Sequence, residues 1–184
     1  MQAVLAPPDP PLADELIVLE PLDATHVASM RALGDDADVA RFTLLPSPLN
    51  HGMAREWVER YVVGWREGTL GGFAVVSAEE RVFLGFIGIV RYDPAGSTAE
   101  LGYIVAPEAR GRGVAARALG LLTSWCLDGL GLERIELRID PANLPSLRLA
   151  EKLGYVREGV LRSMPFKDGV RADLAVYSRL PGDG

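Results

Sequence analysis

The sequence is poor in the residues that build disulfides and metal sites. It contains one cysteine, Cys126, so an internal disulfide is excluded and a reducing cytoplasm is the expected compartment. Cys126 stands in the apolar helical run 121–130, which favours a place in the core over a nucleophilic role. The two histidines, His26 and His51, have no second ligand at metal-site spacing, and we therefore expect no metal.

Long apolar runs and excess positive charge are also missing. No run approaches the ~20 residues that a membrane helix requires, so we expect no membrane partner. The formal net charge of −6 argues against nucleic acid as a partner. The proline-rich segment 1–12 lacks the basic-then-apolar order of a signal peptide and is expected to be a flexible tail. The rest, 13–184, is expected to form a single domain, and its oligomeric state, including a homodimer, stays open.

Hydrophobic periodicity predicts the elements of this domain. Strands are expected at 16–22, 73–78, 82–92, 99–105, 133–140, 155–161 and 173–180. Helices are expected at 23–33, 53–66, 114 to about 130 and 144–153, with the acidic stretch 34–38 as a break. The crossover within 99–140 requires two parallel strands, whereas the flanking hairpins are antiparallel. The fold class is therefore α/β (α+β), with a central mixed, mostly antiparallel sheet of about seven strands and helices on both faces.

The turn between strand 99–105 and the next helix is the most informative part of the chain. It carries Arg110, Gly111, Arg112 and Gly113, and the helix after it offers unpaired N–H groups and the positive end of its dipole. Together with Arg117, these arginines form a basic spot on an acidic protein. The turn is typical of a phosphate or pyrophosphate site.

Two families use such a turn. Gly111-x-Gly113-x-x-Ala116 fits a dinucleotide-binding fingerprint, but Asp140, its candidate acidic partner, follows the glycines by more than the usual ~20 residues. Arg110-x-x-Gly113-x-Ala115 instead resembles the acetyl-CoA pyrophosphate loop of the GNAT superfamily of acetyltransferases. The antiparallel pattern before the turn favours the second interpretation.

The element order resembles the GNAT fold over nearly the whole chain, and the second half is similar to the RimJ/RimL-like ribosomal-protein N-terminal acetyltransferases. The match in the first half is only in outline. The matching blocks are Glu100-Leu-Gly-Tyr103, Arg110 to Ala115, Asn143-x-x-Ser146, Glu151-Lys-Leu-Gly-Tyr155, Glu158-Gly159 and Asp173-Leu-x-Val-Tyr177.

The resemblance implies acetyl-CoA as cosubstrate and an amine as acceptor. It implies that the pyrophosphate binds Arg110, Gly111, Arg112, Gly113, Val114 and Ala115, and that the pantetheine arm lies along Ile104, Val105 and Asn143. Ser146 would hydrogen-bond the departing thiolate, because Ala150 stands where many GNATs carry a tyrosine for that role. Glu100 is the candidate proton acceptor, with a carboxylate from the first half of the chain as the alternative.

Several functions remain open from the sequence. The acceptor amine is a protein N-terminus or a small amine such as an amino acid, polyamine or aminoglycoside, and the acyl group could differ from acetyl. The acidic residues Asp35, Asp36, Asp38, Glu56 and Glu59 would suit a cationic acceptor. An acyl-CoA sensor without turnover is a second class, and an NAD-dependent enzyme, which would need a parallel sheet, is a third.

Overall fold

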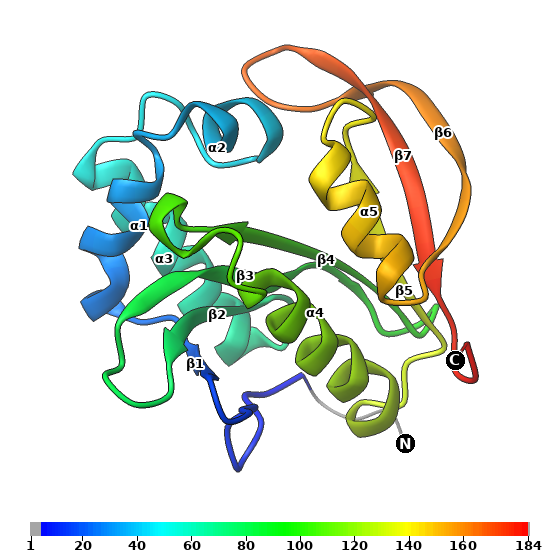
Figure 1. Ribbon diagram of the computed structural model, residues 1–184, viewed down its shortest axis with the longest axis horizontal. Helices are drawn as coiled ribbons and strands as arrows, with labels where there is room; N and C mark the ends of the chain where they lie inside the picture. Colours follow the sequence, from blue (N-terminus) through cyan, green and yellow to red (C-terminus); the bar gives the residue numbers. More distant parts are fainter. Residues whose placement is uncertain (1–4, 184) are drawn as a thin grey trace.

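Seven strands form one open sheet at the centre of the protein, shown in the computed structural model of Figure 1, which describes residues 5–183. The strand order is β1-β2-β3-β4-β5-β7-β6. Only β4 and β5 run parallel, and every other neighbouring pair is antiparallel. The strands are β1 (Ile17–Pro21), β2 (Gly71–Ser77), β3 (Phe83–Asp93), β4 (Thr98–Val105), β5 (Arg134–Ile139), β6 (Val156–Pro165) and β7 (Arg171–Arg179). The predicted mixed, mostly antiparallel sheet is confirmed.

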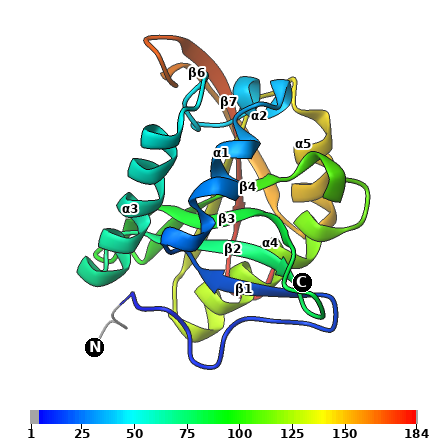
Figure 2. The same ribbon diagram turned by 90° about the vertical axis from the view of Figure 1, so that its left-hand side faces the viewer.

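Helices cover both faces of the sheet: α3 lies on one face, and α4 and α5 lie on the other (Figures 1 and 2). Cys126, in the π-helical turn that follows α4, is buried, and burial raises the pKa of its thiol, in agreement with a core position. The helices are α1 (Val27–Leu33), α2 (Ala37–Phe42), α3 (His51–Glu67), α4 (Val114–Ser124) and α5 (Leu144–Lys152), with 3₁₀ turns at Ala24–His26 and Pro107–Ala109 and a π-helical turn at Trp125–Gly129.

The helix α2 is absent from the sequence-based prediction, which placed a break at 34–38. The acidic residues there do interrupt α1, but Asp36 also starts a new helix, because its Oδ1 accepts a hydrogen bond from the Val39 backbone N–H at 2.9 Å. The strand β6 is also longer than expected and reaches Pro165 instead of ending near Leu161. Both differences matter because these segments form walls of the cavities described below.

The described part of the N-terminal segment, from Leu5 onward, contacts the domain. Leu5 is buried, and the Leu12 carbonyl accepts a hydrogen bond from the Leu19 N–H at 2.8 Å. Residues 1–4 of the expected tail lie outside the described residues. Over residues 5–183, no helix is long and apolar enough to cross a membrane.

The parallel pair at the centre of the sheet separates along its length. Strands β4 and β5 pair from Thr98 opposite Arg134 only as far as Glu100 opposite Glu136. Beyond that point β4 continues to Val105 while pairing only with β3. The backbone of β4 after Glu100 therefore faces a gap on the side of β5, and this gap positions the site.

Candidate active site

Two cavities meet at the gap between β4 and β5. The first, here called the loop cavity, has a volume of about 720 Å³ and lies against the glycine turn, α4 and α5. The second, here called the sheet cavity, has a volume of about 360 Å³ and lies between α3, β4, β5 and the end of β6. Both volumes fall in the range of small-molecule sites. The residues that line both cavities are Phe42, Thr43, Tyr103, Ile104, Asn143 and Ser146.

The glycine turn forms one end of the loop cavity. Gly111 and Gly113 have φ angles of 74° and 77°, in the left-handed region that favours glycine. Gly113 is the N-cap of α4, whose first-turn N–H groups have no partner within the helix. Of the predicted pyrophosphate ligands, Arg110, Gly111, Gly113, Val114 and Ala115 line this cavity, whereas Arg112 is exposed outside its lining.

Two arginines of the predicted basic spot, Arg110 and Arg117, form ion pairs with acidic residues of the protein. Nη2 of Arg110 lies 2.7 Å from Oδ1 of Asp36, and the hydrogen bond from Arg110 is the main reason that the pKa of Asp36 is lowered. Nη1 of Arg117 lies 2.7 Å from both Asp14 and Glu15, so this arginine binds the N-terminal segment. Of the three arginines of the predicted basic spot, only Arg110 lines the loop cavity, whose wall also contains Lys152.

The ion pair leads to a test of Arg110. We expect Arg110→Ala to raise the dissociation constant of coenzyme A tenfold or more, because a charge-assisted hydrogen bond contributes roughly 1.5–3 kcal/mol. Asp36→Asn is the matched control: asparagine also caps a helix, and the change frees the guanidinium, so affinity should be kept or increased. Calorimetric titration of both variants measures this. Equal weakening by both would show that the ion pair acts by positioning α2 rather than by binding phosphate.

Three polar side chains meet where the two cavities join. Oδ1 of Asn143 accepts a hydrogen bond from the Ser146 N–H at 3.3 Å, which makes Asn143 the N-cap of α5. The Tyr103 hydroxyl is buried and lacks a hydrogen bond of good geometry to the described residues. Burial raises the pKa of Tyr103, and the nearby Ser146 hydroxyl partly opposes this rise. Tyr103 thus presents a neutral hydroxyl beside Ser146, a role for which the sequence contains no signal.

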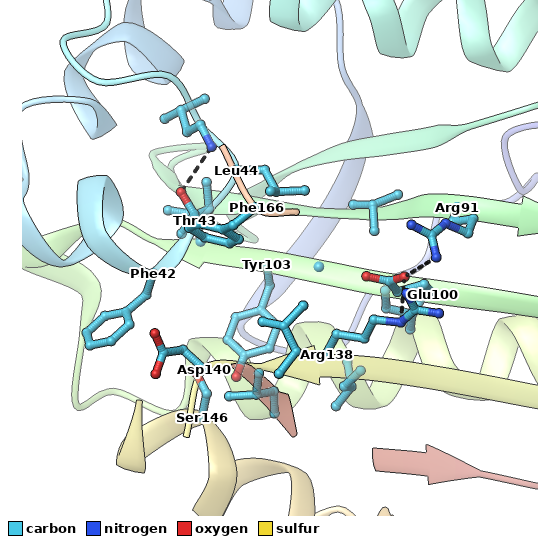
Figure 3. Close-up of a pocket in the computed structure, with 18 of the residues that line it drawn as sticks. Phe42, Thr43, Leu44, Arg91, Glu100, Tyr103, Arg138, Asp140, Ser146 and Phe166 are labelled. Atoms are coloured by element: carbon cyan, nitrogen blue, oxygen red, sulfur yellow. Dashed lines mark hydrogen bonds and ion pairs between the residues drawn. The ribbon is translucent and has the colours of Figure 1, made fainter. Parts of the chain in front are cut away.

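Glu100 lies in the sheet cavity between two arginines (Figure 3). Its Oε2 is 3.3 Å from Nη1 of Arg91 and 3.3 Å from Nε of Arg138. The side chain is 14% exposed, and Oε2 has no hydrogen bond to the described residues. Burial raises the pKa of Glu100, and the two guanidinium groups lower it by less. Glu100 is therefore a carboxylate in the cavity wall that is more basic than a free glutamate.

Asp140 is a second carboxylate of the sheet cavity, at the end of β5. Figure 3 shows it on the Ser146 side of the cavity, away from Glu100. Its Oδ1 accepts a hydrogen bond from the Ala142 N–H at 2.8 Å, and no ion pair between described residues includes it. The sequence raised Asp140 only as a ribose ligand in the dinucleotide interpretation, which the antiparallel sheet excludes.

Apolar side chains make up most of the remaining wall of the sheet cavity, and the sequence carried no signal for them. They come from segments far apart in the chain, mainly the end of α2, the middle of α3 and the β6–β7 hairpin. They include Phe42, Leu44, Trp57, Phe86, Met164 and Phe166.

Lys167 joins two segments of the sheet-cavity wall, the β6–β7 hairpin and residues 40–45. Nζ of Lys167, in the β6–β7 hairpin, donates hydrogen bonds to the carbonyls of Leu45, at 2.9 Å, and of Ala40. These bonds join the hairpin to segment 40–45, and both carry residues of the cavity lining. Burial lowers the pKa of this ammonium group.

Known proteins show the same architecture. The family described as "Acetyltransferase (GNAT) domain" matches residues 17–156. The chain is 25% identical over 169 residues to the uncharacterized N-acetyltransferase p20 of Bacillus licheniformis, covering 92% of this chain and 95% of that protein. It is 26% identical over 126 residues to the ribosomal-protein-serine acetyltransferase of Escherichia coli, covering 68% and 69% of the two chains.

A solved structure agrees with the fold. The RimL ribosomal L7/L12 α-N-protein acetyltransferase in complex with coenzyme A superposes with a TM-score of 0.82. The identity is 17%, and the superposition covers 92% of this chain and 96% of that one. With the family match spanning residues 17–156, the chain belongs to the GNAT family of acetyl-CoA-dependent N-acetyltransferases.

Proposed function

We propose that the protein transfers the acetyl group of acetyl-CoA to a primary amine bound in the sheet cavity. The observation that carries this proposal is the junction of the two cavities in the gap between β4 and β5. The loop cavity opens on unpaired helix N–H groups suited to a pyrophosphate, and the sheet cavity holds a buried carboxylate suited to an amine. A donor and an acceptor in these cavities would meet beside Tyr103 and Ile104.

The residues of the loop cavity would hold and orient the donor. The turn N–H groups from Gly111 to Ala115 and the Arg110 guanidinium would bind the pyrophosphate. Backbone groups of Ile104 and Val105, which face the gap, would hydrogen-bond the pantetheine arm as an added strand does. The side-chain amide of Asn143 would do the same, because capping of α5 occupies only its oxygen.

The residues at the junction would support the chemistry. Acetyl-CoA supplies a thioester carbonyl, at which a C–N bond to the amine forms and the C–S bond breaks. A backbone N–H of β4 would donate to the carbonyl oxygen as it gains charge. Ser146, with the Tyr103 hydroxyl beside it, would hydrogen-bond the thiolate that leaves.

Proton removal is the role proposed for Glu100. A terminal α-amino group has a pKa of ~7.7–8.0 and a lysine side chain ~10.4, so most of either amine is protonated at neutral pH. Glu100 would accept this proton directly or through a water molecule. The unpaired carboxylate of Asp140 is the competing candidate, and the variants that separate the two are described in the Discussion.

Two similar proteins are named for ribosomal proteins, so a protein α-amino group is one candidate acceptor beside small primary amines. A cytoplasmic enzyme would fit such acceptors and the single buried cysteine.

Thiol release tests the proposed function. With acetyl-CoA and a panel of peptides, amino acids and polyamines, we expect amine-dependent release of coenzyme A. Ultrafiltration should show that the protein retains acetyl-CoA but not NADH. Binding of acetyl-CoA with no release for any amine would indicate a sensor and contradict the proposal.

A further inference from the structure

One charged side chain in the wall of the sheet cavity, Arg60, has no ion-pair partner among the described residues. The wall contains three arginines, Arg60, Arg91 and Arg138, and two carboxylates, Glu100 and Asp140. Arg91 and Arg138 both pair with Glu100. Arg60 pairs with no acidic group, since no ion pair within residues 5–183 includes it. Arg138 also pairs with Glu136, at 3.2 Å, so carboxylates neutralise both Arg91 and Arg138, and Arg60 carries the charge that is free to bind a ligand.

Arg60 is exposed at the edge of the cavity, and its guanidinium lies beside two aromatic rings. Its guanidinium carbon lies 5.8 Å from the ring centroid of Trp57 and 5.9 Å from that of Tyr61, at distances typical of cation–π contacts. Trp57 precedes Arg60 by three residues on α3, so the two side chains lie on the same side of the helix. Nε1 of Trp57 is buried and has no hydrogen-bond acceptor within the described part of the chain. One wall of the cavity thus presents two unused donors, one of them charged.

Unused donors in the wall of a cavity favour a ligand that brings acceptor atoms. A buried N–H without a partner costs free energy that a bound acceptor would recover. Because one of the two donors is a guanidinium, whose planar fork matches a carboxylate or phosphonate, an anionic group is the best complement. The unpaired Arg60 guanidinium would also disfavour polyamines and aminoglycosides, which carry several positive charges. Asp36 and Asp38, which could attract such cations, are paired with Arg110 outside this cavity.

The volume of the sheet cavity and the segments that form its wall favour a small acceptor. Its volume of about 360 Å³ lies at the low end of the range for small-molecule sites. Segment 40–45 and the β6–β7 hairpin, joined through Lys167, both contribute to its wall. A protein N-terminus would need a path for the chain that follows it, whereas a free amine needs none. The apolar lining, including Phe42 and Phe166, suits a compact hydrocarbon body.

We propose that the acceptor is a small amino-acid-like molecule, in which a primary amine and an anionic group are carried on a compact apolar body. The amine would face Glu100, and the anionic group would bind the Arg60 guanidinium and Trp57 Nε1. This inference rests on the proposed function and narrows its substrate class.

Matched acceptors test the inference. Thiol release from acetyl-CoA would be measured with free leucine, methionine and phenylalanine, with the amide of each, and with spermidine. We expect the free acids to be acetylated with the highest kcat/KM, although their amines are the more fully protonated. Arg60→Gln should raise the KM for the free acids about tenfold and leave the amides unaffected. Arg55→Gln, an exposed arginine of α3 outside the cavity, is the matched control and should change neither.

The outcomes separate this inference from the proposed function. Preference for amides, peptides or spermidine, with no effect of Arg60→Gln, would overturn the inference and leave the acetyltransferase intact. An equal loss on acids and amides in Arg60→Gln would also overturn it, because the arginine would then support the wall rather than bind an anion. No thiol release with any amine would overturn the proposed function itself.

Discussion

Replacing Gly113 by valine should abolish binding of coenzyme A. Gly113 has a φ of 77° at the start of α4, and a β-carbon built there meets no protein atom within 4 Å. The valine side chain would therefore occupy space that the protein leaves free and that we assign to the pyrophosphate. Calorimetric titration with coenzyme A should show no binding, while the circular dichroism spectrum remains that of a folded protein.

Gly131→Val is the matched control for backbone strain. Gly131 has a φ of 67°, its β-carbon would also meet nothing within 4 Å, and it does not line the loop cavity. Both variants should lose similar thermal stability, because valine is strained in the left-handed region. Only Gly113→Val should lose the ligand. Normal titration of Gly113→Val would place the pyrophosphate elsewhere, and loss of binding in both would assign the effect to strain.

Glu100→Gln should lower kcat by about a hundredfold or more, the range of general-base contributions, with little change in acetyl-CoA affinity. The substitution keeps the shape of the side chain and removes the proton acceptor. Asp140→Asn is the competing variant, and it should keep most of the activity. A large loss of kcat in Asp140→Asn with normal turnover in Glu100→Gln would transfer the role to Asp140.

The pH profile gives a sharper readout of the same role. A base must be ionised, so activity should fall as the pH drops through the pKa of Glu100. Burial raises this pKa, and the acid limb of the profile should therefore lie above the usual range of a glutamate. Arg91 lowers the pKa of Glu100, so Arg91→Gln should move the limb to higher pH. An acid limb unmoved in Arg91→Gln would contradict the assignment.

The glycine turn and the helix cap of the site could be predicted from the sequence, because the signals for both are local. The turn at Gly111 and Gly113 and the cap at Asn143 depend on neighbouring residues, and the structure places them as expected in the cavity walls. The crossover also determined that one pair of strands is parallel. The roles assigned to these residues in catalysis remain proposals.

Features of the site that depend on contacts between distant segments could not be predicted from the sequence. Arg110 lies 74 residues from Asp36, and Arg117 lies 103 residues from Asp14, so neither ion pair leaves a periodic signal. The helix α2 was missed because aspartates at 35–38 read equally well as a break and as a cap. Trp57 and Tyr61 contact each other as an i,i+4 pair on α3, but the contact between Trp57 and Phe86 of β3 depends on tertiary packing.

Phe42 and Thr43 belong to the walls of both cavities, so the two proposed substrates would share a boundary. Any displacement of this boundary by acetyl-CoA changes the space offered to the amine. By thermodynamic linkage, the amine must then change the affinity for acetyl-CoA by the same factor. Binding in the two cavities would then be coupled. The affinity measured for either ligand alone would differ from its affinity in the ternary complex, in which the transfer takes place.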